Sequence, residues 1–402
     1  MKQSARVNAA AELTEEIFAF KRPADAAVKE YFKARRYIGG GDRRAISDLV
    51  WRSVRRYGRL SLLCPFDLTG RAAVAAVLKY DGENPEIFFT GEQYAPAALS
   101  EEEKEFLNAL PSELPHAENE CPSDFADKID RTELIAMADE APFDLRVNTL
   151  KSDRKKVLEM LAREGIEAQE TPFSKSGIRL NGRLNLRDSE LLENGLADVQ
   201  DEGSQIVSFL TQAKAGETVM DWCAGAGGKT LAMAAMMENK GTIYAADANV
   251  KRLKDLPDRA VRAGVRNVIL LNGYDSLKSY DLVLVDAPCS GTGTWRRAPD
   301  ARWRTSGRDV EHLVAVQAEI LEKASRYVKK GGRLFYITCS LLREENEEQA
   351  ERFLKAHEDF CLQDLSPVLK ETTGIETSSA TVRLRPSVCG TDGFFAASFL
   401  KR

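Results

Sequence analysis

Two short cysteine-containing segments carry the residues of this chain that are best suited to covalent chemistry. Cys289 lies in residues 286–291 (DAPCSG) and Cys339 lies in residues 336–340 (YITCS). A thiolate is a strong nucleophile, and a second thiol beside it can act as an acid or base. A free cysteine is more often a small buried hydrophobe, but the neighbouring Pro and Ser suit a turn better than a core. We therefore expect both thiols in one active site, and the residues alone do not decide which thiol attacks.

Each cysteine follows a run of strand-forming residues. Residues 282–285 (LVLV) and 333–337 (RLFYI) are short, β-branched or aromatic, and bounded by Asp, Pro or Gly, as buried parallel strands are. In open α/β sheets, ligands bind just beyond the carboxyl ends of such strands. This placement predicts that both thiols project into a site and not into a core.

A glycine-rich turn upstream predicts a cofactor site. Residues 218–230 (TVMDWCAGAGGKT) are typical of a strand, a turn and the start of a helix, where glycine lets a ligand approach the backbone. A nucleoside-triphosphate loop needs Gly where Cys223 stands, and a dinucleotide loop needs Gly where Thr230 stands. Since neither fits, we expect S-adenosylmethionine. The residues expected to hold it are Cys223, Ala224, Gly225, Ala226, Gly227, Gly228 and Lys229.

The next predicted strand, residues 241–247 (GTIYAAD), adds an acid to this site. Asp247 stands where a carboxylate could accept hydrogen bonds from a ribose. A helix cap is the favoured interpretation of Asp247 taken alone. Its position after the glycine-rich turn favours the ribose contact.

The composition is ordinary for a soluble globular protein. Of 402 residues, 30% are charged and 43% hydrophobic, and no run approaches the roughly 18 apolar residues that a membrane span needs. The seven cysteines include no Cys-x-x-Cys pair, so we expect reduced thiols, no disulfide framework and no metal site. The first residues favour a polar helix over a signal peptide, which predicts a cytoplasmic protein without a membrane partner.

The net charge of −5 conceals a strong asymmetry. Residues 1–64 hold 14 Lys/Arg against 7 Asp/Glu, and residues 65–145 hold 5 against 19. A predicted helix starting near Asp42 carries apolar residues on one side and a stripe of cations on the other. The stripe could follow an RNA backbone, and a solvated helix face is the equally weighted alternative. Its members are Arg52, Arg55, Arg56 and Arg59.

Residues 295–304 (WRRAPDARWR) interleave cations with aromatic side chains. Residues 295–308 hold five Arg against one Asp. Such an arm can bind phosphates and stack an unpaired base. A solvated loop would leave two Trp exposed, so we expect RNA contacts from Arg296, Arg297 and Arg302.

The pattern of elements changes twice along the chain. Residues 1–130 read as helices, and residues 131–200 as a small α+β unit of strand, helix and strand. Residues 201–402 alternate strand and helix regularly, which predicts a doubly wound α/β sheet.

Many short segments of residues 142–402 match a known family. They are residues 146–151 (RVNTLK), 199–205 (VQDEGSQ), 223–229 (CAGAGGK), 286–293 (DAPCSGTG), 296–300 (RRAPD), 338–340 (TCS), 345–347 (ENE) and 390–395 (GTDGFF). In these segments the chain resembles the RsmB/Nop/Sun family of RNA (cytosine-5-)-methyltransferases, most closely the bacterial RsmB-type 16S rRNA enzymes. The resemblance implies a Rossmann-like class I S-adenosylmethionine-dependent methyltransferase domain, preceded by a helical NusB-like RNA-binding domain and an RRM-like α+β unit.

The resemblance also implies an order for the two thiols. Carbon 5 of cytosine is a poor nucleophile until a thiolate adds to carbon 6. By resemblance, Cys339 makes this addition and Cys289 promotes release of the methylated product. Asp286 would bind the cytosine edge or the methionine moiety, and Lys229 would support that carboxylate.

Other residues receive binding roles by the same resemblance. Family members usually carry an Asp near the adenine, where this chain has Asn272 first and Asp275 shortly after. Either of these could make that contact. Arg146 and Asn148 are expected to contact RNA.

The activity implied is methyl transfer to carbon 5 of a cytosine in RNA, with 16S rRNA the expected partner and no role for DNA. A tRNA cytosine-5 methyltransferase is one alternative, and an RNA-binding or ribosome assembly factor without activity is another. The intact Cys289, Cys339 and Asp286 favour an enzyme. Methylation of an exocyclic nitrogen would need an Asn/Asp-Pro-Pro-aromatic segment, which residues 286–289 do not supply.

Overall fold

The computed structural model describes residues 1–182, 189–274 and 279–402. Asp275, one of the two residues expected near an adenine, lies outside them. The described chain forms two compact units. Unit 1 contains Met1–Glu140 and Trp295–Gly307, and unit 2 contains Ala141–Thr294 and Arg308–Arg402. The α+β segment thus shares a unit with the segment predicted as a doubly wound sheet, and the predicted RNA arm belongs to unit 1.

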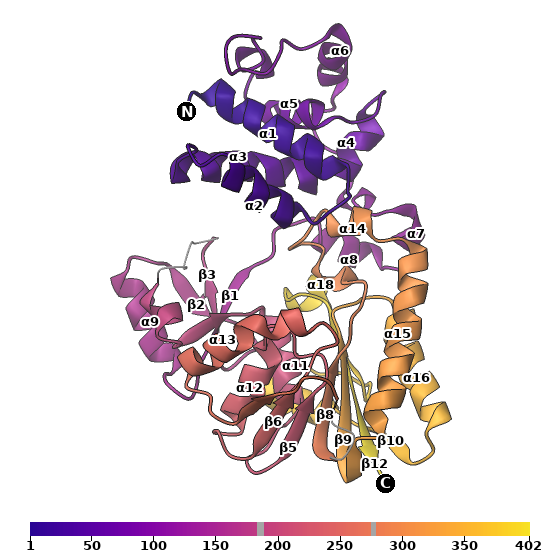
Figure 1. The fold of residues 1–402 in the computed structure, drawn as a ribbon. Coiled ribbons are helices and arrows are strands. Elements are labelled where there is room, and N and C mark those ends of the chain that lie inside the picture. Colours follow the sequence, from indigo (N-terminus) through magenta and orange to yellow (C-terminus); the bar gives the residue numbers. More distant parts are fainter. Residues whose placement is uncertain (183–188, 275–278) are drawn as a thin grey trace. The chain divides into compact units, whose positions relative to one another are not determined.

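Unit 1 is helical (Figure 1). Its central helix α5 is Ala-rich and buried on all sides, because α1, α3 and α6 pack around it. A Cβ atom at Gly70 would lie 2.2 Å from the backbone nitrogen of Glu15, so glycine allows α1 and α5 to cross closely. The helices are α1 (Gln3–Phe18), α2 (Ala24–Ala34), α3 (Gly40–Arg55), α4 (Tyr57–Leu63), α5 (Gly70–Tyr80), α6 (Glu101–Ala109), α7 (Ser123–Ala126), α8 (Arg131–Ala136) and α14 (Ala301–Arg304), with short 3-10 turns η1 (Pro85–Ile87) and η2 (Ala117–Asn119).

The helix that carries the arginine stripe differs from the prediction at both ends. It begins at Gly40 with Gly39 as its N-cap, and Asp42 instead accepts a 2.7 Å hydrogen bond from Nε of Arg6. It ends at Arg55, and α4 begins two residues later. The stripe therefore spans two helices.

Unit 2 begins with a small antiparallel sheet of strand order β2-β3-β1-β4. The expected strand, helix and strand are present as β1, α9 and β3, and the side chain of Asp153 caps α9 by accepting from the backbone N–H of Lys156. The elements of this part are β1 (Phe143–Val147), α9 (Arg154–Arg163), β2 (Ala168–Glu170), β3 (Gly177–Leu180), α10 (Glu190–Glu193) and β4 (Ala197–Val199).

The rest of unit 2 is the predicted doubly wound sheet, with strand order β10-β12-β9-β8-β5-β6-β7 and β11 paired to β12. Neighbours from β9 to β7 run parallel, and β12 runs antiparallel to β9. Its strands are β5 (Thr218–Asp221), β6 (Thr242–Ala245), β7 (Val268–Leu270), β8 (Tyr280–Asp286), β9 (Val328–Thr338), β10 (Phe360–Gln363), β11 (Val382–Leu384) and β12 (Phe394–Lys401).

Helices cover both faces of this sheet (Figure 1). Side chains of α11, α12, α13 and α17 pack on one face, and those of α15 and α16 on the other. Successive residues of β8 enter the two cores alternately, which explains why residues 282–285 are apolar without interruption. The helices are α11 (Glu202–Leu210), α12 (Gly228–Met236), α13 (Leu256–Ala263), α15 (Gly307–Ser325), α16 (Glu347–Ala356), α17 (Ser366–Thr373) and α18 (Pro386–Cys389), with 3-10 turns η3 (Val250–Asp255), η4 (Thr292–Thr294) and η5 (Arg343–Glu345).

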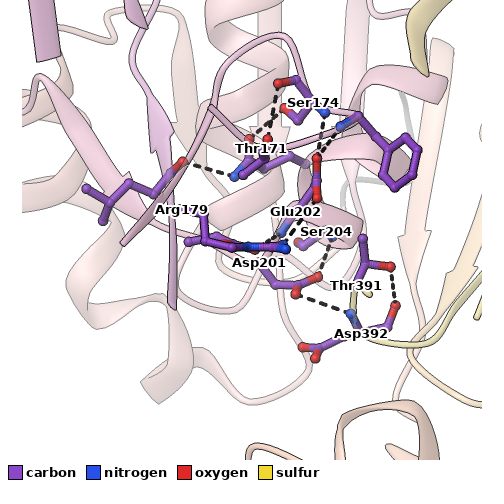
Figure 2. Close-up of polar contacts among 12 residues, drawn as sticks. Thr171, Ser174, Arg179, Asp201, Glu202, Ser204, Thr391 and Asp392 are labelled. Atoms are coloured by element: carbon purple, nitrogen blue, oxygen red, sulfur yellow. Dashed lines mark hydrogen bonds and ion pairs between the residues drawn. The ribbon is translucent and has the colours of Figure 1, made fainter. Parts of the chain in front are cut away.

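The start of α11 joins the small sheet to the large one (Figure 2). The carboxylate of Glu202 accepts hydrogen bonds from the backbone N–H groups of Phe173 and Ser174 at 2.6 and 2.8 Å. It also forms an ion pair with Arg179 at 3.3 Å. Its neighbour Asp201 accepts from the backbone N–H of Asp392, which precedes β12. These contacts fix the two sheets of unit 2 to one helix end.

None of the helices in the part of the chain that the structure describes is long and apolar enough to cross a membrane.

Candidate active site

The predicted site lies where the strand order of the large sheet reverses. From β5 the chain proceeds to β6 and β7 on one side, then returns to β8 and β9 on the other. Such a switch point leaves a crevice beyond the carboxyl ends of the strands. The glycine-rich loop follows β5, and Cys339 follows β9. Asp286 is the last residue of β8, and Cys289 lies in the loop after it. The structure therefore brings the predicted catalytic segments to one edge.

The two predicted catalytic thiols are in contact. Sγ of Cys289 lies 3.4 Å from Sγ of Cys339, and both residues are partly exposed. The hydrogen bond with Cys339 and burial hold the pKa of the Cys289 thiol well above its usual value. Cys289 is therefore a protonated thiol at neutral pH, able to donate a proton toward its neighbour.

An ion pair stands beside the thiols. Nζ of Lys229, in the first turn of α12, lies 2.7 Å from Oδ2 of Asp286 at the end of β8. Burial lowers the pKa of Lys229, but the charge and hydrogen bond of Asp286, with a smaller contribution from Cys339, raise it overall. Lys229 thus keeps its positive charge and orients the carboxylate of Asp286.

The glycine-rich loop has the backbone that a bound cofactor needs. Gly225 and Gly227 have positive φ angles of 51° and 84°, and a Cβ atom at Gly227 would lie 2.1 Å from Leu256. Only glycine therefore fits at position 227. Asp247, just after β6, accepts a 3.0 Å hydrogen bond from the backbone N–H of Gly225 and pairs with Arg252 at 3.2 Å.

The remaining predicted cofactor residues lie around this loop. The backbone N–H of Ala224 donates to Ala246, and the carbonyl of Ala226 accepts from Arg259 at 2.6 Å. Gly228 is the first residue of α12, and burial raises the pKa of the Cys223 thiol, which favours a neutral side chain there. Asn272 follows β7 in a bend and is exposed.

A buried acid near this loop was not predicted from the sequence. Asp221, the last residue of β5, is 1% exposed and accepts a 2.6 Å hydrogen bond from the hydroxyl of Thr230. Burial, and next to it the charge of Asp286, raise its pKa to about 7. Asp221 therefore fastens the strand to the first turn of α12 on which Lys229 lies. Asp221 was missed because it ends a run of strand-forming residues, and such a run is typical of a buried core strand.

Two residues predicted to contact RNA have internal partners instead. The amide of Asn148 donates to the carbonyls of Gly195 and Ala263, both at 2.8 Å, which uses both of its donors. Arg146 is 5% exposed and lies 3.6 Å from Asp198, and burial lowers its pKa to about 10. Both residues join β1 to neighbouring elements of unit 2, so we do not include them in an RNA interface.

The predicted RNA arm is packed into unit 1. Trp295 is fully buried against Phe125, with ring centroids 5.5 Å apart, and Trp303 contacts the ring of Tyr57 at 5.0 Å. Arg302 is buried and donates to the carbonyls of Glu120 and Met137. The expectation that both Trp and Arg302 are available to RNA is therefore corrected, since they form core and internal hydrogen bonds.

The other two arginines of the arm that were predicted to contact RNA do not form an exposed stripe either. Arg296 is 4% exposed, and its carbonyl accepts from Nη1 of Arg55 at 2.9 Å. Arg297 is half-buried and has a partner within the protein. The sequence pattern could not identify the partner of the arm, because the packing surface for the arm comes from residues 20–140.

The arginine stripe of α3 and α4 is likewise paired inside unit 1. Arg52 forms ion pairs with Asp48 and Asp81, and Arg59 donates to Glu120 at 2.9 Å. Arg55 donates to the carbonyl of Asp139 at 3.0 Å, and burial lowers the pKa of Arg56 beside Asp81. Acids far along the sequence neutralise the stripe. The exposed cations of this unit include Lys29, Lys33, Arg36 and Arg44.

Comparisons with known proteins match this chain to methyltransferases. A model of the family described as 16S rRNA methyltransferase RsmB/F matches residues 208–400, and a model of the RsmF/B-like, ferredoxin-like domain matches residues 127–187. A Bacillus subtilis protein named probable ribosomal RNA small subunit methyltransferase B is 35% identical over 268 residues, which cover 64% of this chain and 59% of that protein. The chain thus spans less than two thirds of this relative's length.

Solved structures support the same fold. The crystal structure of a methyltransferase homolog protein from Pyrococcus horikoshii is 32% identical, with a TM-score of 0.58, and covers 71% of this chain and 93% of that one. The crystal structure of PH0851 is 24% identical, covers 100% of this chain and 99% of that one, and at a TM-score of 0.75 shows the fold alone. The predicted Rossmann-like methyltransferase fold is confirmed, and the chain belongs to the RsmB/F family of methyltransferases.

Proposed function

We propose that this protein transfers a methyl group from S-adenosylmethionine to carbon 5 of a cytosine in RNA. The observation that carries the proposal is the contact of the two thiols, 3.4 Å apart at the edge of the sheet that also holds Asp286 and the glycine-rich loop. Addition of a thiolate to carbon 6 is the step that makes carbon 5 of a cytosine nucleophilic. Methylation of an exocyclic nitrogen needs no such thiol.

The residues at the end of β5 and β6 fit the cofactor. Gly225 and Gly227 allow the positive φ angles of the loop, and the backbone N–H groups at the start of α12 lie at the same end of the sheet. We assign the ribose hydroxyls to Asp247 and the adenine side to Asn272. When bound, S-adenosylmethionine supplies an electrophilic methyl group.

We assign attack to Cys339 and release to Cys289. The thiolate of Cys339 adds to carbon 6, and the electron pair of the ring's 5,6 double bond moves toward carbon 5. After methyl transfer, carbon 5 loses its proton to a base, the 5,6 double bond re-forms and the carbon–sulfur bond breaks. The protonated Cys289, in contact with Cys339, can donate a proton to the departing sulfur. Asp286, oriented by Lys229, accepts from the amino edge of the cytosine.

Small-subunit rRNA is the substrate we propose. The support is the printed name of the Bacillus subtilis relative, which is 35% identical over 268 residues. Exposed cations on α2 and α3 of unit 1 are compatible with a polyanionic partner.

Trapping the covalent intermediate tests the assignment. The Cys289→Ala variant, incubated with S-adenosylmethionine and unmodified small-subunit rRNA, should accumulate an RNA–protein adduct that survives a denaturing gel, because release is blocked. Cys339→Ala should form neither adduct nor product. Cys361→Ala, which removes a thiol far from the site in β10, is the matched control and should behave as the unaltered protein.

The opposite pattern would reverse the roles. An adduct in Cys339→Ala and none in Cys289→Ala would make Cys289 the nucleophile. If neither variant changes the rate of methylation, the covalent route is wrong.

A further inference from the structure

Two consecutive buried residues connect the loops that carry the thiols. Glu345 ends the turn η5 and Asn346 immediately precedes α16, and both are 0% exposed. Neither side chain has a role in the proposed chemistry, and a buried carboxylate is costly unless it is fully hydrogen-bonded. Their partners therefore indicate what they do.

Glu345 holds the loop of Cys289 from both sides. Its carboxylate accepts from the backbone N–H of Ser290 at 2.9 Å and from the hydroxyl of the same residue. Nε2 of Gln317, a fully buried residue of α15, donates both to Glu345 and to the carbonyl of Pro288, each at 2.9 Å. The residues directly before and after Cys289 are thus tied to one carboxylate.

Asn346 holds the loop of Cys339 in the same manner. Its amide donates to the carbonyl of Ser340 at 2.8 Å, and its carbonyl oxygen accepts from the hydroxyl of Thr338 at 2.5 Å. These two partners directly precede and follow Cys339. Because Glu345 and Asn346 are joined by a peptide bond, the two loops share one support.

Direct contacts between the loops complete the arrangement. The hydroxyls of Ser290 and Ser340 lie 3.3 Å apart, and those of Thr292 and Ser340 lie 3.2 Å apart. The backbone N–H of Gly293 donates to the carbonyl of Cys339 at 3.0 Å. Neither loop can shift without loss of hydrogen bonds in the other.

We propose that Glu345 and Asn346 are positioning residues that set the contact between the two thiols, Glu345 through the loop of Cys289 and Asn346 through the loop of Cys339. The inference rests on the proposed function for its consequences in catalysis. Because each residue supports a different thiol, their losses should affect different steps. Loss of Glu345 slows release, and loss of Asn346 slows attack.

The charge of Glu345 gives it a second effect on Cys289. Its carboxylate, after the larger effects of Cys339 and burial, raises the pKa of the Cys289 thiol. The hydroxyl of Tyr336 donates to the carbonyl of Glu345 at 2.7 Å. Burial, Cys289 and Glu345 raise the pKa of Tyr336, and the charge of Arg352 in α16 lowers it by a smaller amount. Glu345 thus helps to keep Cys289 protonated.

The catalytic test compares Glu345→Gln and Asn346→Asp with Glu348→Gln, an exposed residue of α16 three positions along. With S-adenosylmethionine and small-subunit rRNA, Glu345→Gln should accumulate adduct and turn over at least tenfold more slowly, with adduct formation unchanged. Asn346→Asp should form adduct at least tenfold more slowly. Glu348→Gln should match the unaltered protein. Equal behaviour of all three, or exchange of the two defects, would overturn the proposal.

A thiol measurement makes the test independent of methylation. The rate of alkylation of Cys289 by iodoacetamide, followed by mass spectrometry across pH, should show a lower midpoint pH in Glu345→Gln and an unchanged midpoint in Glu348→Gln. A loosened loop alone would raise the rate at every pH without moving the midpoint. An unmoved midpoint contradicts the role of Glu345 even if methylation is absent for another reason. If Glu345→Gln does not fold, Gln317→Met removes the second donor and should accumulate adduct.

Discussion

At the scale of single residues, the two cysteines have similar sequence neighbours but different surroundings. Cys289 follows β8, and the backbone N–H of its neighbour Ser290 donates to the buried Glu345. Cys339 follows β9 and contributes to the raised pKa of Lys229. The hydrogen bond with Cys339, burial and the carboxylate of Glu345 raise the pKa of the Cys289 thiol, which therefore keeps its proton. This difference agrees with the order of roles that the family resemblance implied, and the residues alone could not supply it.

The buried acid Asp221 predicts an unusual dependence of stability on pH. An aspartate in the unfolded chain loses its proton near pH 4, whereas in the folded protein its pKa is about 7. Between these values the folded state binds more protons, so its stability should fall as the pH rises, by an amount on the order of 4 kcal/mol. Asp221→Asn, which can still accept from Thr230, should remove this contribution.

Urea unfolding of both proteins at pH 5 and pH 8 measures this effect. Asp221→Asn should be the more stable protein at pH 8 and should lose less stability between the two values. Asp258→Asn, at an exposed position of α13, is the control and should leave the slope unchanged. A parallel dependence in Asp221→Asn and the unaltered protein would mean that Asp221 is ionised throughout.

At this scale the sequence predicted what depends on local spacing. The glycines of residues 225–228 and the cysteines after β8 and β9 lie where the pattern placed them. Arg302 and Asn148 do not serve as expected, because their donors bind carbonyls of segments more than 40 residues away. Spacing along the chain carries no signal for such partners, and an arginine buried on carbonyls has the same neighbours in sequence as one exposed to RNA.

At the scale of elements, continuous apolar runs identified β8 and the second half of β9. A parallel strand covered by helices on both faces needs apolar residues at every position, as in β8. The ends of α3 were predicted less well, since Gly39 acts as N-cap and Asp42 is drawn into an ion pair with Arg6. Contacts with distant residues determine these ends, and the spacing of residues within one helix does not reveal such contacts.

The charged group at the start of α11 predicts a large loss of stability when one member is removed. Arg179 pairs with Asp144 at 2.8 Å and Glu202 at 3.3 Å, and both carboxylates are 0% exposed. Arg179→Met leaves them buried without a cation, which should cost about 3 to 5 kcal/mol in the free energy of unfolding. Unfolding in urea at pH 7 measures it.

The matched control for that variant is Arg326→Met. Arg326, which directly follows α15, pairs with Glu322 of that helix, and their side chains are 68% and 48% exposed. Loss of this pair should lower the free energy of unfolding by about 0.3 to 0.5 kcal/mol. Similar losses in the two variants would show that the start of α11 does not bind the small sheet as tightly as its contacts indicate.

At the scale of the whole molecule, the chain consists of a helical unit and a methyltransferase unit, and residues 295–307 belong to the first although the second surrounds them in sequence. The sequence predicted an RNA-binding arm here. It could not predict that the arm completes the helical unit, because the aromatic and carbonyl partners of the arm are residues of an earlier segment.

The charge of the molecule bears on its partner. The overall net charge of −5 arises from an excess of acids after residue 64, and many of the arginines before it are neutralised by those acids. The cations that remain exposed on α2 and α3 are among those of unit 1 that a polyanion could contact.

The most direct test of the central claim is identification of the methylated base. The protein should be incubated with S-adenosylmethionine labelled in its methyl group and with small-subunit rRNA that lacks modifications, and the RNA then digested to nucleosides. We predict label in 5-methylcytidine, and none in the same experiment with Cys339→Ala. Label in a different nucleoside, or equal label with Cys339→Ala, would contradict the proposed cytosine-5 chemistry.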